Sequence, residues 1–493
     1  MRQRFEQQIS IGGIAIKDVQ FPLKSRDELP PVLKALQYIF ITPSLNEQVF
    51  TILEKKICSN KKKTGRKGMD LWHILVLAVV RHATGIDWDM LETWSNYHSL
   101  VRQLLGVHSK FDDEGKGITF GYQSIIDNVS LIDEQLLYEI NQLVVNAGHA
   151  LVKKKEDEGL ELKTDSYAVE TNVHFPTDLN LLWDSIRKCL DVVAKLQKIA
   201  GHIEGWRKIK YWRSNCKTLF RSASQHVFKG NNEKQKVESV KLYLAAAQEL
   251  KERFERIIEK PPVVIDVAIT AIVEALTHYC DYVKKFTDQV ERRLIKGEQI
   301  PAEEKVFSIF EPHTEWITKG KQNKKVELGH LLLVTTDQYQ FIVDYKVMEK
   351  QKDPAQVIPL LGRIQKNFPS KKISSHSFDK GFYSKDNRAA LEQSATELPV
   401  LPKKGRHNKE DKERESSPEF KRLRHRHSAV ESNINMLEHH GLNRCMDKGL
   451  PNFKRYVGLS ILAYNLHILG NAMQAIERKK QEQQERRQIK MAA

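Results

Sequence analysis

The chain has 493 residues, enough for roughly two to four folding units, and 40% of them are hydrophobic. Lys and Arg total 79 against 63 Asp and Glu, and the formal charge of +16 favours a polyanion such as DNA or RNA as partner. The longest apolar run, Ile74 to Val80, is too short for a membrane span, and five scattered cysteines without a Cys-x-x-Cys pair argue against a zinc site or a disulfide framework. The N-terminus lacks an apolar signal-peptide core, so we expect a cytoplasmic protein.

The first third of the chain is predicted to be helical. In the N-terminal region, residues 1–60, we expect Pro30 and Pro31 to break any early helix. A basic loop follows, and helices joined by tight turns beside such a loop suit a helix-turn-helix DNA-binding domain over 61–155. A helical bundle that contacts only protein is the alternative. The helices are expected from 71 to Gly85, from about 87 to 105, at 122–130 and at 133–153. The loop residues that we assign to DNA are Lys61, Lys62, Lys63, Arg66 and Lys67.

The middle of the chain combines one strand with a long helical region. A strand-like segment at 162–175 is followed by a helical pattern from 181 to 300. Within that region, residues 206–229 hold seven Lys or Arg, no Asp or Glu, and interleaved aromatic side chains. Cations neutralise phosphates and rings stack on unpaired bases, so this stretch is a candidate DNA surface. The alternative is an amphipathic helical hairpin with a buried aromatic face, and the six-residue separation of the two tryptophans predicts that only one is exposed. The residues assigned to DNA here are Trp206, Arg207, Lys208, Trp212 and Arg213.

The last third alternates strands with helices. Residues 329–347 contain two apolar runs joined by a polar turn at Asp337-Gln338. Residues 403–419 are expected to form a polar, charged loop, and residues 477–493 a basic tail that is solvated or disordered. The other expected elements are a helix at 354–367, a strand at 371–379, a helix at 384–394, a strand at 397–402, and helices at about 420–440 and 452–475.

Three acidic residues stand out by their context. Asp165 lies inside an apolar-flanked strand, where an unpaired carboxylate is costly to bury. Asp379 ends another strand, and the glycine two residues later lets the backbone turn and leaves the carboxylate at the mouth of the sheet. Glu431 lies on a helix that could pack against the same edge. Carboxylates placed in this way can share two Mg²⁺ or Mn²⁺ ions about 3.5–4 Å apart for in-line phosphoryl transfer, although a single acidic residue is usually only a solvated surface charge.

Several blocks of the sequence carry a family resemblance. Residues 164–178, TDSYAVETNVHFPTD, resemble the first-aspartate block of bacterial insertion-sequence DDE transposases. Residues 378–384, FDKGFYS, resemble the second-aspartate block of that family. Residues 430–435, VESNIN, with the later Tyr464-Asn465-Leu466, resemble the block that holds the catalytic glutamate. TGRKG at 64–68, followed by leucine-rich helices, resembles the family's N-terminal domain.

The resemblance implies a DNA transposase. Asp165, Asp379 and Glu431 would be its catalytic residues and the ligands of two Mg²⁺ or Mn²⁺ ions. The implied partners are DNA, as terminal inverted repeats and as target, and further copies of the chain in a homodimer or higher homo-oligomer. It also implies a bacterial cytoplasm, with association to the nucleoid when the protein is bound to DNA. The alternatives are a two-metal nuclease without strand transfer and a transposase-derived DNA-binding protein that no longer catalyses.

The predicted fold class is α+β and mainly helical. An N-terminal helical DNA-binding region is followed by an RNase H-like α/β catalytic domain at 160–476. The resemblance implies three strands near the start of the RNase H-like fold. The helical segment 181–300 is therefore expected to be a large insertion after the first strand.

The sequence departs from the family's pattern close to Glu431. Related transposases often place an Arg four residues before the glutamate, but His427 stands at that position here. Arg424 and Arg426 lie nearby. These three basic residues are therefore the candidates for contact with the scissile phosphate.

Overall fold

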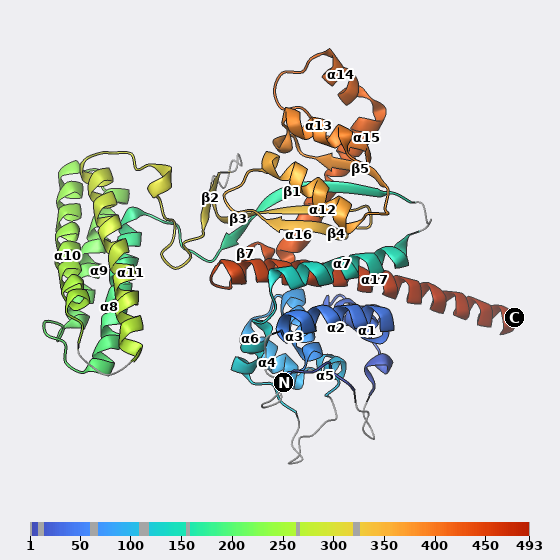
Figure 1. Ribbon diagram of the computed structural model, residues 1–493, viewed down its shortest axis with the longest axis horizontal. Coiled ribbons are helices and arrows are strands. Elements are labelled where there is room, and N and C mark those ends of the chain that lie inside the picture. The colour runs from blue at the N-terminus through green and yellow to red at the C-terminus, as the bar shows by residue number, and fades with distance from the viewer. Residues whose placement is uncertain are drawn as a thin grey trace. The chain divides into compact units, whose positions relative to one another are not determined.

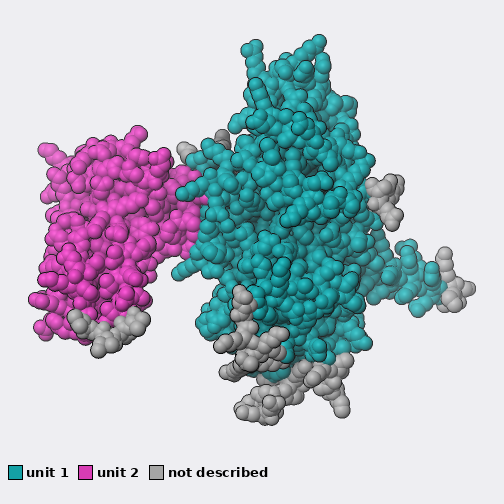
Figure 2. Space-filling model, viewed as in Figure 1, with its two compact units in different colours: residues 1–172, 317–493 teal, residues 173–316 magenta. Residues whose placement is uncertain are grey.

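The computed structural model describes residues 2–7, 14–59, 68–107, 118–153, 158–262, 267–318 and 326–492. The chain divides into two compact units, residues 1–172 with 317–493, and residues 173–316 (Figure 2). Many helices and a mixed sheet place it in the α+β class (Figure 1). The loop residues predicted to contact DNA, Lys61, Lys62, Lys63, Arg66 and Lys67, lie outside the described residues.

The first unit begins with helices, and two details differ from the expectation. Pro30 and Pro31 do not break an early helix: both lie in the first turn of α1, where backbone N–H groups have no helical partner to lose. The helix expected from about 87 to 105 is interrupted at His98, whose side chain caps α5. The helices are α1 (Leu29–Ile41), α2 (Pro43–Ile57), α3 (Leu71–Thr84), α4 (Trp88–Tyr97), α5 (Ser99–Leu105), α6 (Tyr122–Val129) and α7 (Glu134–Val152), after the 3₁₀ turn η1 (Ile16–Asp18).

A mixed sheet forms the centre of the first unit. Among the described residues it has seven strands in the order β2-β3-β1-β5-β6, with β4 also paired to β3 and β7 to β1. β1 runs antiparallel to β3 and parallel to β5, and β6 is parallel to β5. The predicted hairpin around Asp337 is confirmed, since β3 and β4 pair antiparallel. The strands are β1 (Leu160–Thr171), β2 (Glu315–Thr318), β3 (Val326–Thr336), β4 (Ile342–Val347), β5 (Ile373–Phe378), β6 (Thr396–Val400) and β7 (Arg444–Cys445).

Helices connect and follow the strands, and two expectations for them are wrong. The segment 403–419 is a loop only up to Asn408, because Asn408 and Asp411 cap α14 reciprocally. The helix expected at about 420–440 breaks at Ser428 between α15 and α16. The elements are η4 (Asp353–Gln356), α12 (Val357–Asn367), η5 (Lys380–Phe382), α13 (Lys385–Gln393), α14 (Lys409–Ser416), α15 (Pro418–His427), α16 (Ala429–Leu437), η6 (Glu438–Leu442) and α17 (Leu450–Ala492).

The predicted tail continues α17. Residues 479–488 are exposed, as expected for a solvated tail, but they are helical rather than disordered. The buried first half of α17 supplies the costly helix nucleus, and each added polar residue then extends an existing helix. The end of α17 extends away from the other helices of its unit (Figure 1).

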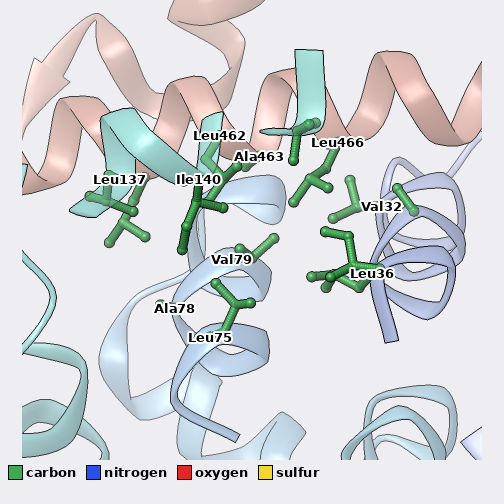
Figure 3. Close-up of a cluster of buried hydrophobic side chains, with 14 of the residues drawn as sticks. Val32, Leu36, Leu75, Ala78, Val79, Leu137, Ile140, Leu462, Ala463 and Leu466 are labelled. Carbon is green, nitrogen blue, oxygen red and sulfur yellow. The ribbon is translucent and has the colours of Figure 1, made fainter. Parts of the chain in front are cut away.

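α17 and the N-terminal helices share one core (Figure 3). Leu36 of α1, Val79 of α3, Ile140 of α7 and Leu466 of α17 are fully buried in it. Burying each such side chain contributes roughly 1.5–3 kcal/mol relative to leaving it exposed. Gly470 allows α17 to approach α1, because a Cβ at this position would lie 1.9 Å from the carbonyl oxygen of Pro31. The N-terminal helices therefore belong to the same compact unit as the sheet.

The second unit is a helical bundle with its own core. Thr177 and Asn180 form a capping box at the start of its first helix. Tyr243, Phe254 and Phe286 are fully buried where the apolar faces of the helices meet. Its elements are α8 (Asp178–Ala200), α9 (Ile209–Lys229), α10 (Glu233–Glu259), α11 (Val267–Val290), η2 (Glu291–Ile295) and η3 (Ala302–Glu304). Across the described ranges of both units, no helix is both long and apolar enough to cross a membrane.

Candidate active site

The pairing of β1 with β5 brings two of the predicted acidic residues together. Thr164 of β1 pairs with Phe378, the last residue of β5, so Asp165 and Asp379 are the next residues on neighbouring strands. Neighbouring strands lie about 4.8 Å apart. Asp379 is exposed, whereas Asp165 is half-buried and accepts a 2.7 Å hydrogen bond from the backbone N–H of Ser166. The register therefore places both aspartates where β5 ends.

A further carboxylate, which the sequence analysis missed, lies beside this pair. Asp353 begins η4, and its Oδ1 accepts a 2.7 Å hydrogen bond from Ser166 Oγ, next in the chain to Asp165. A Cβ placed on Gly381 would lie 3.6 Å from Asp353 Oδ2 and 3.8 Å from Asp379 Oδ2, so both oxygens face the space that the glycine leaves open. In the sequence, Asp353 is only the first residue of an Asp-Pro pair at the start of a helix. This is a common pattern at helix starts, so no signal there marks Asp353 as functional. Asp165, Asp353 and Asp379 together are called the carboxylate edge.

Glu431 lies in the first turn of α16, the helix that packs against β1. Its side chain is exposed, while Val430 and Leu437 of the same helix are fully buried. Within the part of the chain that the structure describes, no group of three or more His, Cys, Asp or Glu side chains is close enough to hold a metal ion. The structure thus aligns the two aspartates without gathering Glu431 into a preformed group with them.

A buried polar network supports the strands next to the carboxylate edge. Thr164 Oγ1 lies 2.7 Å from Thr335 Oγ1 and 2.8 Å from His376 Nε2. Ser377 Oγ lies 3.0 Å from His427 Nδ1, which joins the end of α15 to β5. These contacts link β1, β3, β5 and α15 through residues that come one to three positions before Asp165 and Asp379 in the chain.

The two histidines of this network are neutral at neutral pH. Burial lowers the pKa of His427 to about 4, against the attraction of Asp379 and with the repulsion of Lys163. Burial, and then the nearby His427, lowers the pKa of His376 to about 3. His427 was a candidate for contact with the scissile phosphate, but a half-buried neutral ring bound to Ser377 provides no cation for that role.

The exposed cations near Glu431 lie on α15. Arg424 and Arg426, both predicted to contact DNA, are exposed, and Arg426 forms an ion pair with Glu161 at 2.7 Å. Phe420 and Leu423 bury the other side of α15 in a small apolar cluster. The helix therefore presents a basic surface shortly before the predicted catalytic glutamate. Its exposed basic side chains are Lys421, Arg422, Arg424, His425 and Arg426.

The aromatic residues predicted to stack on DNA are divided between the core and the surface of the second unit. Trp206 is 2% exposed and stacks on Phe254 with ring centroids 5.3 Å apart, so it cannot stack on a base unless this core opens. Trp212 is half-buried, with the guanidinium carbon of Arg253 4.1 Å from its ring centroid. Tyr211 is 57% exposed. The alternative of a helix with a buried aromatic face therefore describes the tryptophans better than the DNA hypothesis does.

The cations of the same stretch remain at the surface. Arg207 and Lys208 precede α9 and are exposed, whereas Arg213 is half-buried and forms an ion pair with Asp191. Three exposed cations and one exposed phenylalanine recur along one line of α9 at helical spacing. We call these four residues the basic face of α9. They are Lys210, Lys217, Arg221 and Phe228.

Comparison with protein families gives a match to one part of the chain. Residues 295–466 match the family model described as "Transposase DDE domain". This range contains Asp353, Asp379 and Glu431 and begins after Asp165 in the chain. No curated protein and no solved structure gives a significant match. The match confirms the resemblance to DDE transposases over residues 295–466 of the chain.

Proposed function

We propose that this chain cleaves the terminal inverted repeats of its own mobile element and joins the freed ends to target DNA. Its transposase DDE domain makes it a nucleic-acid phosphoryl-transfer enzyme with DNA as partner. The observation that carries the finer proposal is the register of β1 and β5, which aligns Asp165 with Asp379. Like charges on neighbouring strands repel each other, so this alignment favours a site that a cation occupies during function.

Two divalent ions, Mg²⁺ or Mn²⁺, are the proposed cofactor. Asp165, Asp379 and Glu431 would hold them, since carboxylate oxygens are the hard ligands that both ions prefer. Bound ions would activate the attacking oxygen and stabilise the leaving oxygen of the phosphodiester. The donor set fits this role because Asp379 and Glu431 are exposed and Asp165 lies on the strand beside Asp379. We expect Glu431 to complete the set only when metal and DNA bind.

The chain's own side chains would position the reacting groups. His427 and His376, both neutral, would hold the end of β5 in place through Ser377 and Thr164. Arg424 and Arg426 would bind phosphates of the DNA backbone, because a guanidinium forms paired hydrogen bonds with phosphate oxygens. Arg426 would exchange Glu161 for phosphate in that complex.

We also propose an RNase H-like fold for the sheet domain, with the limits 160–476 and the helical insertion 181–300. The run of β1, β3 and β4, which pair antiparallel, supports it, because the family resemblance implies three strands near the start of the fold. A DNA-binding role for the helices of 61–155, an insertion-sequence origin, and a homodimer or higher homo-oligomer on paired ends complete the proposal.

An assay with two stages tests the proposed reaction. The full chain is first incubated with Mg²⁺ and linear DNA that ends in the repeats of the element, and then with a supercoiled target. Cleavage at the repeat ends followed by joined products is the expected result. Cleavage without joining would instead identify a two-metal nuclease, and specific binding without cleavage would identify a DNA-binding protein that no longer catalyses.

The basic face of α9 is the proposed DNA contact of the second unit. Replacing Lys217 and Arg221 by Gln should reduce the slope of log affinity against log salt by about two, since each lost phosphate contact removes about 0.9. Lys234 and Lys241 on α10 are exposed cations of the same unit, and the Lys234→Gln, Lys241→Gln protein is the matched control. Equal slopes for the two double variants would remove α9 from the DNA interface.

A further inference from the structure

A chain of three hydrogen-bonded polar side chains lies across the sheet from the carboxylate edge, at the end where β1 and β5 begin. Asp337 Oδ2 is 2.5 Å from His149 Nε2, and His149 Nδ1 is 2.6 Å from Nζ of Lys371. The three residues come from the turn after β3, from α7 and from the turn before β5. The proposed DNA chemistry uses none of them. They are called the lysine edge.

The surroundings of Asp337 determine which nitrogen of the histidine carries the proton. Asp337 is 1% exposed, and its Oδ1 accepts hydrogen bonds of 2.9 Å from the backbone N–H groups of Tyr339 and Phe341. Its Oδ2 therefore accepts from Nε2–H of His149, and in the neutral ring this leaves Nδ1 as an acceptor. An acceptor that faces an amine at 2.6 Å is placed to take a proton from it.

The surroundings of Lys371 increase the fraction of its amine that is neutral. Burial, and then the positive charge of Lys153, lowers the pKa of Lys371 to about 8, against the attraction of Asp337. Nζ also lies 2.9 Å from Asn146 Oδ1 and 4.8 Å from the ring centroid of Phe368. A neutral amine has two N–H groups, and the two acceptors, Asn146 and His149, use both. The lone pair is then left for a reagent, and the side chain is only partly buried.

We propose that Lys371 is an acylation site that reacts with activated acyl donors of the acyl phosphate class. The Nζ lone pair attacks the acyl carbon, the bond from that carbon to the phosphate oxygen breaks, and inorganic phosphate leaves with the electron pair. The proton lost by Nζ moves to His149 Nδ1, and Asp337 stabilises the imidazolium until solvent removes that proton. The amide product has one N–H and no charge, so it cannot keep the contacts of Nζ with both Asn146 and His149.

The neighbouring lysine is the internal control. Lys372 is 58% exposed and forms an ion pair with Glu397 at 2.8 Å. If access to the reagent alone decided the rate, Lys372 would react at least as fast as Lys371. If the geometry of the lysine edge decides it, Lys371 reacts faster although it is the more buried of the two.

The experiment exposes the full chain to acetyl phosphate at about pH 7.5 and follows both lysines at low conversion by peptide mass spectrometry. We expect Lys371 to react about tenfold faster than Lys372, because the gain in neutral amine exceeds the loss of nucleophilicity that accompanies a lower pKa. In concentrated urea the two rates should become equal. A folded-state ratio below about three, or a ratio that urea leaves unchanged, overturns the proposal.

A variant tests the part played by the histidine. His149→Asn should slow the acylation of Lys371 at least about fivefold and leave Lys372 unchanged, because the proton acceptor is lost. An unchanged rate at Lys371 in the folded variant removes His149 from the reaction. If the variant does not fold, the comparison of the two lysines in the unmodified chain still decides the proposal.

Discussion

The two edges of the sheet place aspartates in opposite surroundings. At the carboxylate edge, Asp379 is exposed and Asp165 stands beside it on the neighbouring strand. At the lysine edge, Asp337 is 1% exposed, and His149 and two backbone N–H groups donate to its oxygens. The first pair can offer oxygen lone pairs to a cation, whereas Asp337 uses its oxygens to hold the fold.

This difference shows that burial, rather than residue type, decides what a carboxylate does in this protein. Removing the exposed carboxylate of Asp379 should change the reaction and leave the fold intact. Removing a buried and fully hydrogen-bonded one should change the fold and leave the reaction of the folded molecules intact. Variants at the two edges test this separation.

The largest effect is expected for Asp379→Asn. Loss of a metal ligand should lower the rate of DNA cleavage by about 1,000-fold or more, since a bound metal contributes several kcal/mol to the transition state. The thermal unfolding midpoint should not fall, because Asp379 is exposed. Asp386→Asn, at an exposed acidic residue of α13, is the control and should cleave normally. Near-normal cleavage by the Asp379 variant would remove this residue from the active site.

A smaller effect is expected for Asp353→Asn. The amide can still accept the hydrogen bond from Ser166 but lacks the charge beside Asp379, so cleavage should slow about 10- to 100-fold and need more Mn²⁺ for half-maximal rate. Ser166→Ala keeps the charge and removes the hydrogen bond, which separates the two contributions. If Asp353→Asn left both the rate and the Mn²⁺ requirement unchanged, Asp353 would be only the first residue of η4.

At the lysine edge, Asp337→Asn should destabilise the fold by about 1–3 kcal/mol. The new amide NH₂ would face Nε2–H of His149, and a buried donor without an acceptor costs about that much. Thermal unfolding measures the loss, and cleavage per folded molecule should stay unchanged. A variant that is fully stable but inactive would show that the two edges are not separable in this way.

The smallest effect at neutral pH concerns His427. Its folded-state pKa of about 4 lies below the ordinary value of 6.5, so the unfolded state binds more protons between these two values. The stability that the neutral ring contributes is complete above about pH 6.5 and is lost as the pH falls toward 4, and about 2 kcal/mol should be gone at pH 5.

His427→Asn should reduce this acid sensitivity, because the unfolded chain then has one histidine fewer to protonate. The thermal midpoint measured between about pH 7.5 and pH 5 reports the change. His425→Asn, at an exposed histidine of the same helix, is the control and should keep the pH dependence of the unmodified chain. Identical pH profiles for the two variants would contradict the neutral, buried state of His427.

Local patterns predicted most of the strands and helices of the first unit. The alternation around Asp165 and the turn at Asp337 lie in short segments, and the structure has β1, β3 and β4 there. The predictions were wrong where the effect of a residue on the backbone depends on its position within the helix. Pro30 and Pro31 are compatible with a helix in its first turn, and the charged segment 403–419 contains a helix with two capping residues.

The sequence by itself indicated the resemblance to DDE transposases and the three candidate catalytic residues, because each of these residues lies in a contiguous motif. Only the tertiary structure decided that Asp353 joins the carboxylate edge, that His427 is neutral, and that Trp206 is a core residue. Each of these properties depends on atoms supplied by distant parts of the chain. Burial and hydrogen bonding between such parts arise only when the strands and helices pack, so no local pattern could reveal them.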